Sequence, residues 1–434
     1  MTDAAIEWWG KAGDHALRRS ANQEAMAHLT AGLAQLIQLP EDQERAKLEL
    51  ALQAMLGKAS MAAKGYASPE AIRAFSRAHE LCAEFGRDSN IFPVLFGVWL
   101  FELTRAHHDD AGRTAVEFLE RTRLIGDAGD RAAAHFSMAV SGVHLGDLPR
   151  VLLHSEEAIR YFGDMKDPDA TAFEYGVELG AASYAYSAWC LWLLGQVDQA
   201  LQFGNRALVI STDMQHVYTR ARGLYWNSAL HAYRREWPIV EERAAAAISV
   251  AKEHGFSMVV AVSRIMQVSA KAMQDPRVEF AAEIREALAA YHATGARFQS
   301  TYHLILLAQT MIACGRYDEA FQSLREAAAL AEKTGERYVE AEIHRLEGNL
   351  LLKQAGCGSA AGERCYLMAL EVARAQQARS LELRASSDLA RLWVERGERG
   401  RAADLIGPVY GLFTEGFDTL DLKEAKALLD QLAP

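Results

Sequence analysis

The sequence predicts an all-α protein in which about ten antiparallel helix pairs stack into a superhelix. Its 434 residues include only 9 Pro, about 2% against the usual ~5%, and Ala, Leu, Glu and Arg dominate, which favours helix throughout. Half of the residues are hydrophobic, which excludes a disordered chain because such chains bury too little apolar surface to fold. The third observation is an internal repeat with helical spacing between its copies.

The repeat consists of a Gly or polar turn, a bulky residue, an Ala, and a second small residue seven positions later. The clearest copies are LGQVDQALQFGNRAL, around Ala200 and Ala207, and CGRYDEAFQSLREAA, around Ala320 and Ala327. Further copies have their first anchor at Ala25, Ala71, Ala115, Val151, Val240, Ala282, Gly362 and Ala402, with second anchors at Ala158 after Val151 and Ala247 after Val240. The ten first anchors recur at intervals of about 42 residues, a period typical of helical repeat arrays.

Apolar residues between the anchors follow a helical period. Before the Gly195 turn, Tyr184, Ser187, Ala188 and Leu191 stand at positions i, i+3, i+4 and i+7, which is one face of a helix. The β-branched strands and turn clusters of a propeller blade are missing. Each unit is therefore predicted to be two helices, and the small anchors mark where the second helix approaches its neighbours closely. One pair cannot bury its own apolar face, so the pairs should stack.

Proline and glycine mark the expected helix boundaries. Proline tolerates the first turn of a helix and glycine often follows the last turn. We therefore expect second helices to begin near Pro69, Pro238 and Pro276, with Asp275 as an N-cap. Four glycines should end second helices: Gly86, Gly255, Gly295 and Gly335. We expect one domain over residues 1–434, a hinge near 163–170 and a terminal capping helix over 418–432.

Charge and composition exclude several classes of protein. The chain carries 46 Lys and Arg against 57 Asp and Glu, a net charge of −11, which repels a nucleic-acid backbone. The longest apolar run, Ile91–Phe101, is too short for a membrane span, and the charged N-terminus is not a signal peptide. Five scattered cysteines without a C-x-x-C pair suit a reducing compartment. We therefore expect a cytoplasmic protein that binds neither nucleic acid nor membranes.

The register of the repeat resembles the tetratricopeptide repeat. A bulky residue is followed four positions later by a small one in the first helix, as in Tyr184/Ala188 and Leu304/Ala308. Several segments more specifically resemble the repeat region of bacterial multidomain adenylate/guanylate cyclases that carry an AAA-type NTPase module: Trp8–Leu33, Lys64–Cys82, Glu342–Leu352, Ser380–Trp393 and Pro408–Leu432. The resemblance implies a right-handed superhelix and an association with a nucleotide-dependent signalling module. The catalytic domains of such proteins lie outside the region that this chain matches.

A search for catalytic and cofactor motifs is negative. No G-x-x-x-x-G-K-[ST] sequence is present, and the glycine-rich segment Gly356–Gly362 lacks the following Lys, so we interpret it as an inter-helix loop. The run His107-His108-Asp109-Asp110 resembles a metal motif, but four consecutive residues cannot converge on one ion, which favours a solvated helix end. We expect no catalytic residue, no cofactor and no metal.

Candidate binding residues come from the first helices, which line the concave wall in a superhelix of this kind. Counting from the anchors, the positions expected to face a ligand are Phe136, Val140, Trp189, Trp192, Arg222, Tyr225, Tyr233, Tyr302 and Gln309. Rigid aromatic rings and directional Arg hydrogen bonds suit a peptide. A register slip of one residue would move these side chains from the groove into the core, and both interpretations stay open here.

Near the C-terminus, seven arginines between Arg374 and Arg401 alternate with Glu and Asp, which predicts a solvated, salt-bridged face. The sequence as a whole favours a non-catalytic regulatory or scaffolding module that binds a protein or peptide in its groove. The alternative is a sensor arm that binds a small ligand in the same groove. A homo-oligomer stays open, and an enzyme is the least supported of the functions weighed.

Overall fold

The computed structural model describes residues 2–19, 21–64, 68–85, 91–214 and 216–433, which form 22 α-helices without a strand. Twenty of them form ten pairs. The first helices are α1 (Thr2–Arg18), α3 (Gln43–Lys64), α5 (Ile91–Thr104), α7 (Ala128–Leu145), α10 (Leu179–Leu193), α12 (Val217–Tyr233), α14 (Ser257–Gln274), α16 (Ser300–Ala313), α18 (Glu340–Ala355) and α20 (Arg379–Glu395). The second helices are α2 (Asn22–Leu36), α4 (Pro69–Phe85), α6 (His108–Ile125), α8 (Leu148–Gly163), α11 (Val197–Asp213), α13 (Trp237–Glu253), α15 (Glu279–Ala293), α17 (Tyr317–Thr334), α19 (Ala360–Ala375) and α21 (Arg399–Tyr410).

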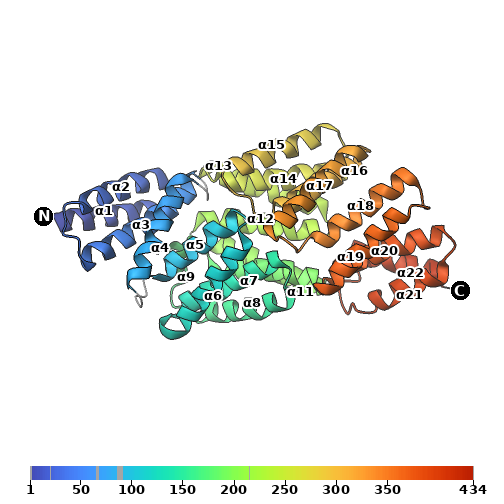
Figure 1. Cartoon of the computed structure of the whole chain (residues 1–434), viewed down its shortest axis with the longest axis horizontal. Coiled ribbons are helices and arrows are strands. Elements are labelled where there is room, and N and C mark those ends of the chain that lie inside the picture. Colours follow the sequence, from blue (N-terminus) through green and yellow to red (C-terminus); the bar gives the residue numbers. More distant parts are fainter. Residues whose placement is uncertain (1, 20, 65–67, 86–90, 215, 434) are drawn as a thin grey trace.

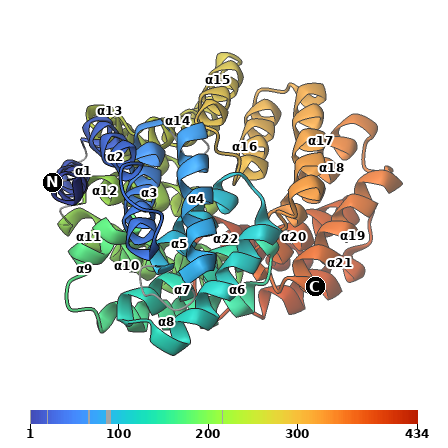
Figure 2. The ribbon, with the colours of Figure 1, turned by 60° about the vertical axis from the view of Figure 1, so that its left-hand side comes forward.

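The pairs are stacked from one end of the molecule to the other. Figure 1 shows α1–α4 at one end, α18–α22 at the other end, and the middle helices wound around the long axis between them. Each helix packs mainly on its neighbours in the chain, as expected for a solenoid. Figure 2 shows second helices such as α8, α11, α15 and α17 at the periphery of the molecule. The predicted all-α solenoid of ten helix pairs is confirmed.

The small anchors lie in the second helices, and nine of the ten first anchors are buried. Ala200, Ala320 and Ala402, for example, have no exposed surface. The exception is Ala282, which is exposed while its neighbour Ala281 is buried, so the anchor assigned to α15 was wrong by one residue. By sequence alone either Ala281 or Ala282 could be the anchor, because three of the four consecutive residues Glu279–Ala282 are apolar.

Enlarging an anchor should destabilise the array. Ala207 on α11 is almost fully buried, so the substitution Ala207→Leu forces extra atoms into a packed interface. We expect a loss of roughly 1–3 kcal/mol of stability and a lower thermal midpoint in circular dichroism. Asn205→Leu, at an exposed position of the same helix, is the control. Equal midpoints for the two variants would contradict the close packing at Ala207.

The expected helix boundaries agree with the structure except at one proline. Helix α4 begins at Pro69 and α13 begins at Trp237 with Pro238 in its first turn, while Gly335 follows α17 with a positive φ of 74°. Asp275 does not cap a helix N-terminus: it follows the end of α14, and α15 begins only at Glu279. Gly86 lies outside the described residues.

Two helices stand outside the ten pairs. Helix α9 (Pro168–Tyr175) is a short additional helix, and residues 163–170, the expected hinge, span the end of α8, a connection and the start of α9. Helix α22 (Leu420–Leu432) covers the last pair, with Leu422, Ala425 and Leu428 buried against α20 and α21.

Successive turns of the superhelix are in direct contact. The carbonyl oxygen of Thr104, at the end of α5, accepts hydrogen bonds from the backbone N–H groups of Arg297 (2.7 Å) and Phe298 (3.2 Å), just before α16. The backbone carbonyl oxygen of His144, in α7, accepts a hydrogen bond from the backbone N–H of Arg337 (2.7 Å), just before α18. In both contacts the two helices belong to pairs that are five pairs apart. The last carbonyls of a helix have no partner within it, so these bonds satisfy groups that a buried helix end would leave unpaired. One superhelical turn therefore takes about five pairs.

This winding buries the inner surface of the first helices. In α10, all residues from Leu179 to Leu193 except Tyr184 are buried, and α7 and α12 are buried along most of their length. Such continuous burial explains the apolar run in α5 without a lipid environment. None of the described helices combines the length and apolar character that a membrane crossing requires.

A candidate ligand pocket between the turns of the superhelix

The nine groove residues predicted from the sequence divide into two groups. Four of them line a cavity between the turns of the superhelix, and they are Trp192, Tyr233, Tyr302 and Gln309. The other five do not line this cavity and are at least nine-tenths buried: Phe136, Val140, Trp189, Arg222 and Tyr225.

The buried group forms part of an aromatic column along the inner faces of the first helices. The Phe136 ring contacts the Tyr186 ring at a centroid distance of 5.8 Å, and the Tyr186 ring lies 4.8 Å from that of Trp189. Trp189 donates from its indole N–H to the carbonyl of Trp226, and Tyr225 donates to Gln299 Oε1 of the next turn (2.8 Å). These side chains therefore face the superhelix axis, but the chain itself covers them.

The cavity has a volume of about 390 Å³ and is bordered by α10, α12, α16, α18, α20 and α22. Its apolar wall is built on stacked rings: Trp192 and Tyr233 lie parallel at 5.0 Å, and Tyr302 lies 5.1 Å from Tyr233. Ile305 and Leu346 extend this wall along α16 and α18. Because these five side chains come from four helices, α10, α12, α16 and α18, the cavity depends on the winding of the array.

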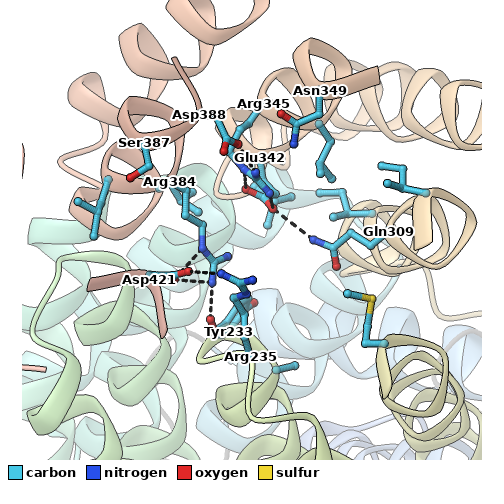
Figure 3. Close-up of a pocket in the computed structure, with 18 of the residues that line it drawn as sticks. Tyr233, Arg235, Gln309, Glu342, Arg345, Asn349, Arg384, Ser387, Asp388 and Asp421 are labelled. Atoms are coloured by element: carbon cyan, nitrogen blue, oxygen red, sulfur yellow. Dashed lines mark hydrogen bonds and ion pairs between the residues drawn. The ribbon is translucent and has the colours of Figure 1, made fainter. Parts of the chain in front are cut away.

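Charged side chains also line the cavity. Arg345 on α18 pairs with Glu342 (2.7 Å) and with Asp388 on α20 (2.5 Å). Figure 3 shows this group facing Gln309, whose amide donates to Glu342 Oε1 (3.2 Å). Ser387 and Asn349 border the same space.

A second charged group joins α12, α20 and α22 at the other side of the cavity. Arg384 donates to Asp421 Oδ2 (2.8 Å) and to the carbonyl of Tyr233 (2.6 Å), as Figure 3 shows. Its guanidinium also lies 4.8 Å from the centre of the Trp192 ring. Arg235 donates to Asp421 Oδ1 (3.0 Å) and to Glu424 (3.0 Å). These bonds link residues up to 189 positions apart in the sequence.

Neighbouring arginines lower the pKa values of two carboxyl groups of the cavity, those of Asp421 and Glu342. Burial alone would raise the pKa of Asp421, but Arg384 and Arg235 outweigh it and hold that pKa below its ordinary value. Burial likewise acts to raise the pKa of Glu342, and Arg345 and Arg384 reverse the effect. Four arginines and four acidic side chains line the cavity, so their formal charges balance. These residues are Arg235, Arg345, Arg384, Arg391, Glu342, Asp388, Asp421 and Glu424.

This arrangement suits recognition. Aromatic rings beside paired guanidiniums, carboxylates and amides offer contact area together with directional hydrogen bonds. A ligand of strong net charge gains little here because the wall is neutral overall, whereas a ligand with groups of both signs can engage both.

Sequence reasoning missed the charged wall. Arg384 and Asp388 belong to the stretch predicted to be solvated, yet their side chains are only 13% and 15% exposed, so that prediction was wrong for them. Mixed charges at helical spacing look the same whether water or another turn of the superhelix covers them. Their partner Asp421 lies in a separate helix, and no local signal joins the two.

Sequence comparisons identify one distant relative and no family. No protein-family model matches the chain. An uncharacterized protein of Rhizobium meliloti is 23% identical over 406 residues, covering 92% of this chain, and the chain spans 38% of that relative's length.

Three solved structures illustrate the fold. The Cut9–Hcn1 hetero-tetramer of the APC/C has a TM-score of 0.51 at 12% identity, over 97% of this chain and 75% of that one. A Rap protein complexed with Competence and Sporulation Factor has a TM-score of 0.48 at 12% identity, over 100% and 99% of the two chains. A human IFIT1 dimer with m7Gppp-AAAA has a TM-score of 0.45 at 14% identity, over 91% and 87%. The likeness to the Cut9–Hcn1 structure, at 12% identity, shows the fold alone, a tetratricopeptide-like helical solenoid.

Proposed function

We propose that the protein is a non-catalytic recognition module that binds a short peptide segment of a partner protein in the cavity between the turns. The observation that carries the proposal is the mixed lining of the cavity, in which stacked Trp192, Tyr233 and Tyr302 lie beside mutually paired Arg, Asp and Glu side chains. A peptide offers apolar side chains to the aromatic rings. Its main-chain amides and terminal charges suit the paired charged groups.

The cavity also defines how the partner enters. Ala313, at the end of α16, borders the cavity and is exposed, so it marks the mouth. The surrounding wall is neutral overall, and the chain has a net charge of −11. A nucleic acid would therefore meet repulsion from the chain without a basic surface at the site. These charges support a peptide over an RNA segment.

The test is selection of peptides followed by blocking of the mouth. A display library of random short peptides is selected on the purified chain, and the affinity of enriched peptides is measured by fluorescence anisotropy. Ala313→Trp should weaken binding about tenfold or more because the indole occupies the mouth, which corresponds to about 1.4 kcal/mol. Ala375→Trp, at an exposed position of α19 outside the cavity, should bind as the wild type does. Failure to enrich any peptide, or equal binding by both variants, would contradict the proposal.

A small-ligand sensor is the second candidate, and the size of the cavity favours it. Its volume of about 390 Å³ lies at the lower end of the ~300–1,000 Å³ typical of small-molecule sites. Free amino acids and dipeptides, which carry both charges, are the probes that separate the two candidates. Thermal stabilisation of the chain by these compounds, lost in Ala313→Trp, would favour the sensor. Stabilisation by longer peptides alone would favour the peptide-binding module.

We also propose that the regulated partner is a nucleotide-dependent signalling module, attached to the chain or associated with it. The support is the resemblance of Trp8–Leu33 and Pro408–Leu432 to the repeat regions of cyclase–NTPase proteins. More than half of the Rhizobium meliloti relative lies outside its match to this chain. The genomic reading frame and its neighbours test this idea: a cyclase or P-loop NTPase should be encoded there, and its absence from both would contradict the association.

A further inference from the structure

Three buried titratable side chains meet where the first and second turns of the superhelix touch. His108 is the first residue of α6, His144 lies in the last turn of α7, and Glu336 lies in the connection between α17 and α18. Each is at most 1% exposed. Glu336 is 192 residues away from His144 in the sequence, so the cluster exists only in the wound superhelix.

The donor atoms of the three side chains converge. His144 Nδ1 lies 2.9 Å from Glu336 Oε1, and His108 Nε2 lies 4.0 Å from the same oxygen. One donor atom from each side chain can be chosen so that all three lie within 4.8 Å of one another. A tetrahedral zinc ion with bonds of 2.0–2.1 Å holds its donors about 3.3 Å apart, so side-chain rotations closing the widest gap by about 1.5 Å would suffice.

Several polar atoms of the cluster have no partner among the described residues. They are both ring nitrogens of His108, Nε2 of His144 and Oε2 of Glu336. A buried polar atom without a hydrogen bond costs about 1–3 kcal/mol, and such groups in a folded protein call for a water or an ion. A cation among these atoms would satisfy several at once and would offset the charge of the buried carboxylate.

We propose that His108, His144 and Glu336 form a site for a divalent transition-metal ion, with Zn²⁺ the ion that suits them best. Two imidazoles and a carboxylate are borderline donors that suit zinc, whereas magnesium and calcium prefer oxygen ligands alone. The ion would connect α6 and α7 of one turn to the α17–α18 connection of the next. This site goes beyond the sequence expectation of no metal, because only His108 of the run His107-His108-Asp109-Asp110 points into the interior while His107 and Asp109 are exposed.

Zinc titration of the full-length chain tests the site. Purified protein is stripped with a chelator, titrated with Zn²⁺ alone by calorimetry, and its metal content is measured after gel filtration. We expect one tightly bound zinc per chain and a higher thermal midpoint with zinc than with chelator, since binding to the folded state stabilises it. Cobalt substitution should give the visible absorption of a tetrahedral site. A stripped wild type that takes up no zinc would overturn the proposal.

Two variants separate this site from adventitious binding. His108→Phe keeps a buried ring of similar size and should lose zinc binding at least tenfold together with the zinc-dependent shift in melting. The control is His154→Phe on α8: His154 lies 3.1 Å from His135, Nδ1 to Nδ1, in a histidine pair outside the cluster. It should bind zinc as the wild type does. Equal zinc binding by His108→Phe, or loss of zinc in the control, would overturn the assignment. Should His108→Phe not fold, Glu336→Gln replaces it with the same expected loss.

Discussion

Deletion of residues 418–434 should unfold the C-terminal helix pairs and make the protein aggregate. Helix α22 buries Leu422, Ala425 and Leu428 against the last pair, and removing it exposes the apolar faces of α20 and α21. Buried leucines contribute roughly 1.5–3 kcal/mol each, so the loss exceeds what one terminal pair can sustain. The deletion also removes Asp421 and leaves Arg384 without its carboxylate. Circular dichroism should show less helix than the missing residues alone account for.

Removal of Ala433 and Pro434 alone is the matched control and should leave the helical signal and the solubility unchanged. Hydrogen exchange can locate the damage, because amides in α20 and α21 should lose protection while those in α5 and α7 keep it. A competing interpretation holds that the apolar stripe of α22 is a docking site for a partner. A soluble and fully helical deletion variant that has lost only peptide binding would favour that interpretation and contradict the capping role.

The helix pairs were predictable because their signals are local. Small residues such as Ala200 and Ala207 recur seven positions apart on one helix, and a turn precedes each such pair. The contact between Thr104 and Arg297 was not predictable in the same way. It depends on the pitch of the superhelix, which follows from small rotations added over five pairs rather than from any one motif. The sequence therefore predicted a superhelix but left open whether its inner residues face a groove or the core, and the structure has a closely wound array.

The candidate site was predicted in part for the same reason. The residues on the axis-facing sides of the first helices were found, as Trp192 and Tyr233 show by lining the cavity. The pitch of the superhelix determines whether such a residue contacts the next turn or lines a cavity. Trp189 is covered by other parts of the chain, whereas Trp192, on the same helix, borders the cavity. The histidine and glutamate of the proposed metal site escaped notice because His144 and Glu336 lie in separate repeats without a shared motif.

Replacing Arg384 with alanine should loosen the contact between the turns more than any other single substitution at the cavity. The guanidinium holds Asp421 and the carbonyl of Tyr233 at once, and its side chain is only 13% exposed. Removing one partner of a buried ion pair costs roughly 3–5 kcal/mol because the remaining charge stays buried. Arg235 still contacts Asp421, so we expect the lower part of that range. The effect is measured as the change in the urea concentration at which half of the molecules have unfolded α20 and α22. Hydrogen exchange of the amides in these two helices monitors the unfolding.

The effect of Arg384→Ala should also depend on pH with a defined sign. The pKa of Asp421 is lower in the folded chain than its unfolded value near ~3.9, so the ion pair stabilises the fold fully above that pH. Its contribution is lost as the pH falls through the folded pKa. The stability difference between wild type and Arg384→Ala should therefore be constant from pH 5 to 7 and should shrink as the pH falls below about 4.

An exposed arginine provides the comparison that isolates burial as the cause. Arg113 pairs with Asp110, but its side chain is 74% exposed, and exposed ion pairs contribute at most about 1 kcal/mol. Arg113→Ala should therefore change the urea midpoint slightly and leave the exchange of α20 and α22 untouched. If Arg384→Ala destabilises the chain no more than Arg113→Ala does, the turns are held together by backbone hydrogen bonds and apolar packing alone. The cavity wall would then be free to open when a ligand competes for its charges.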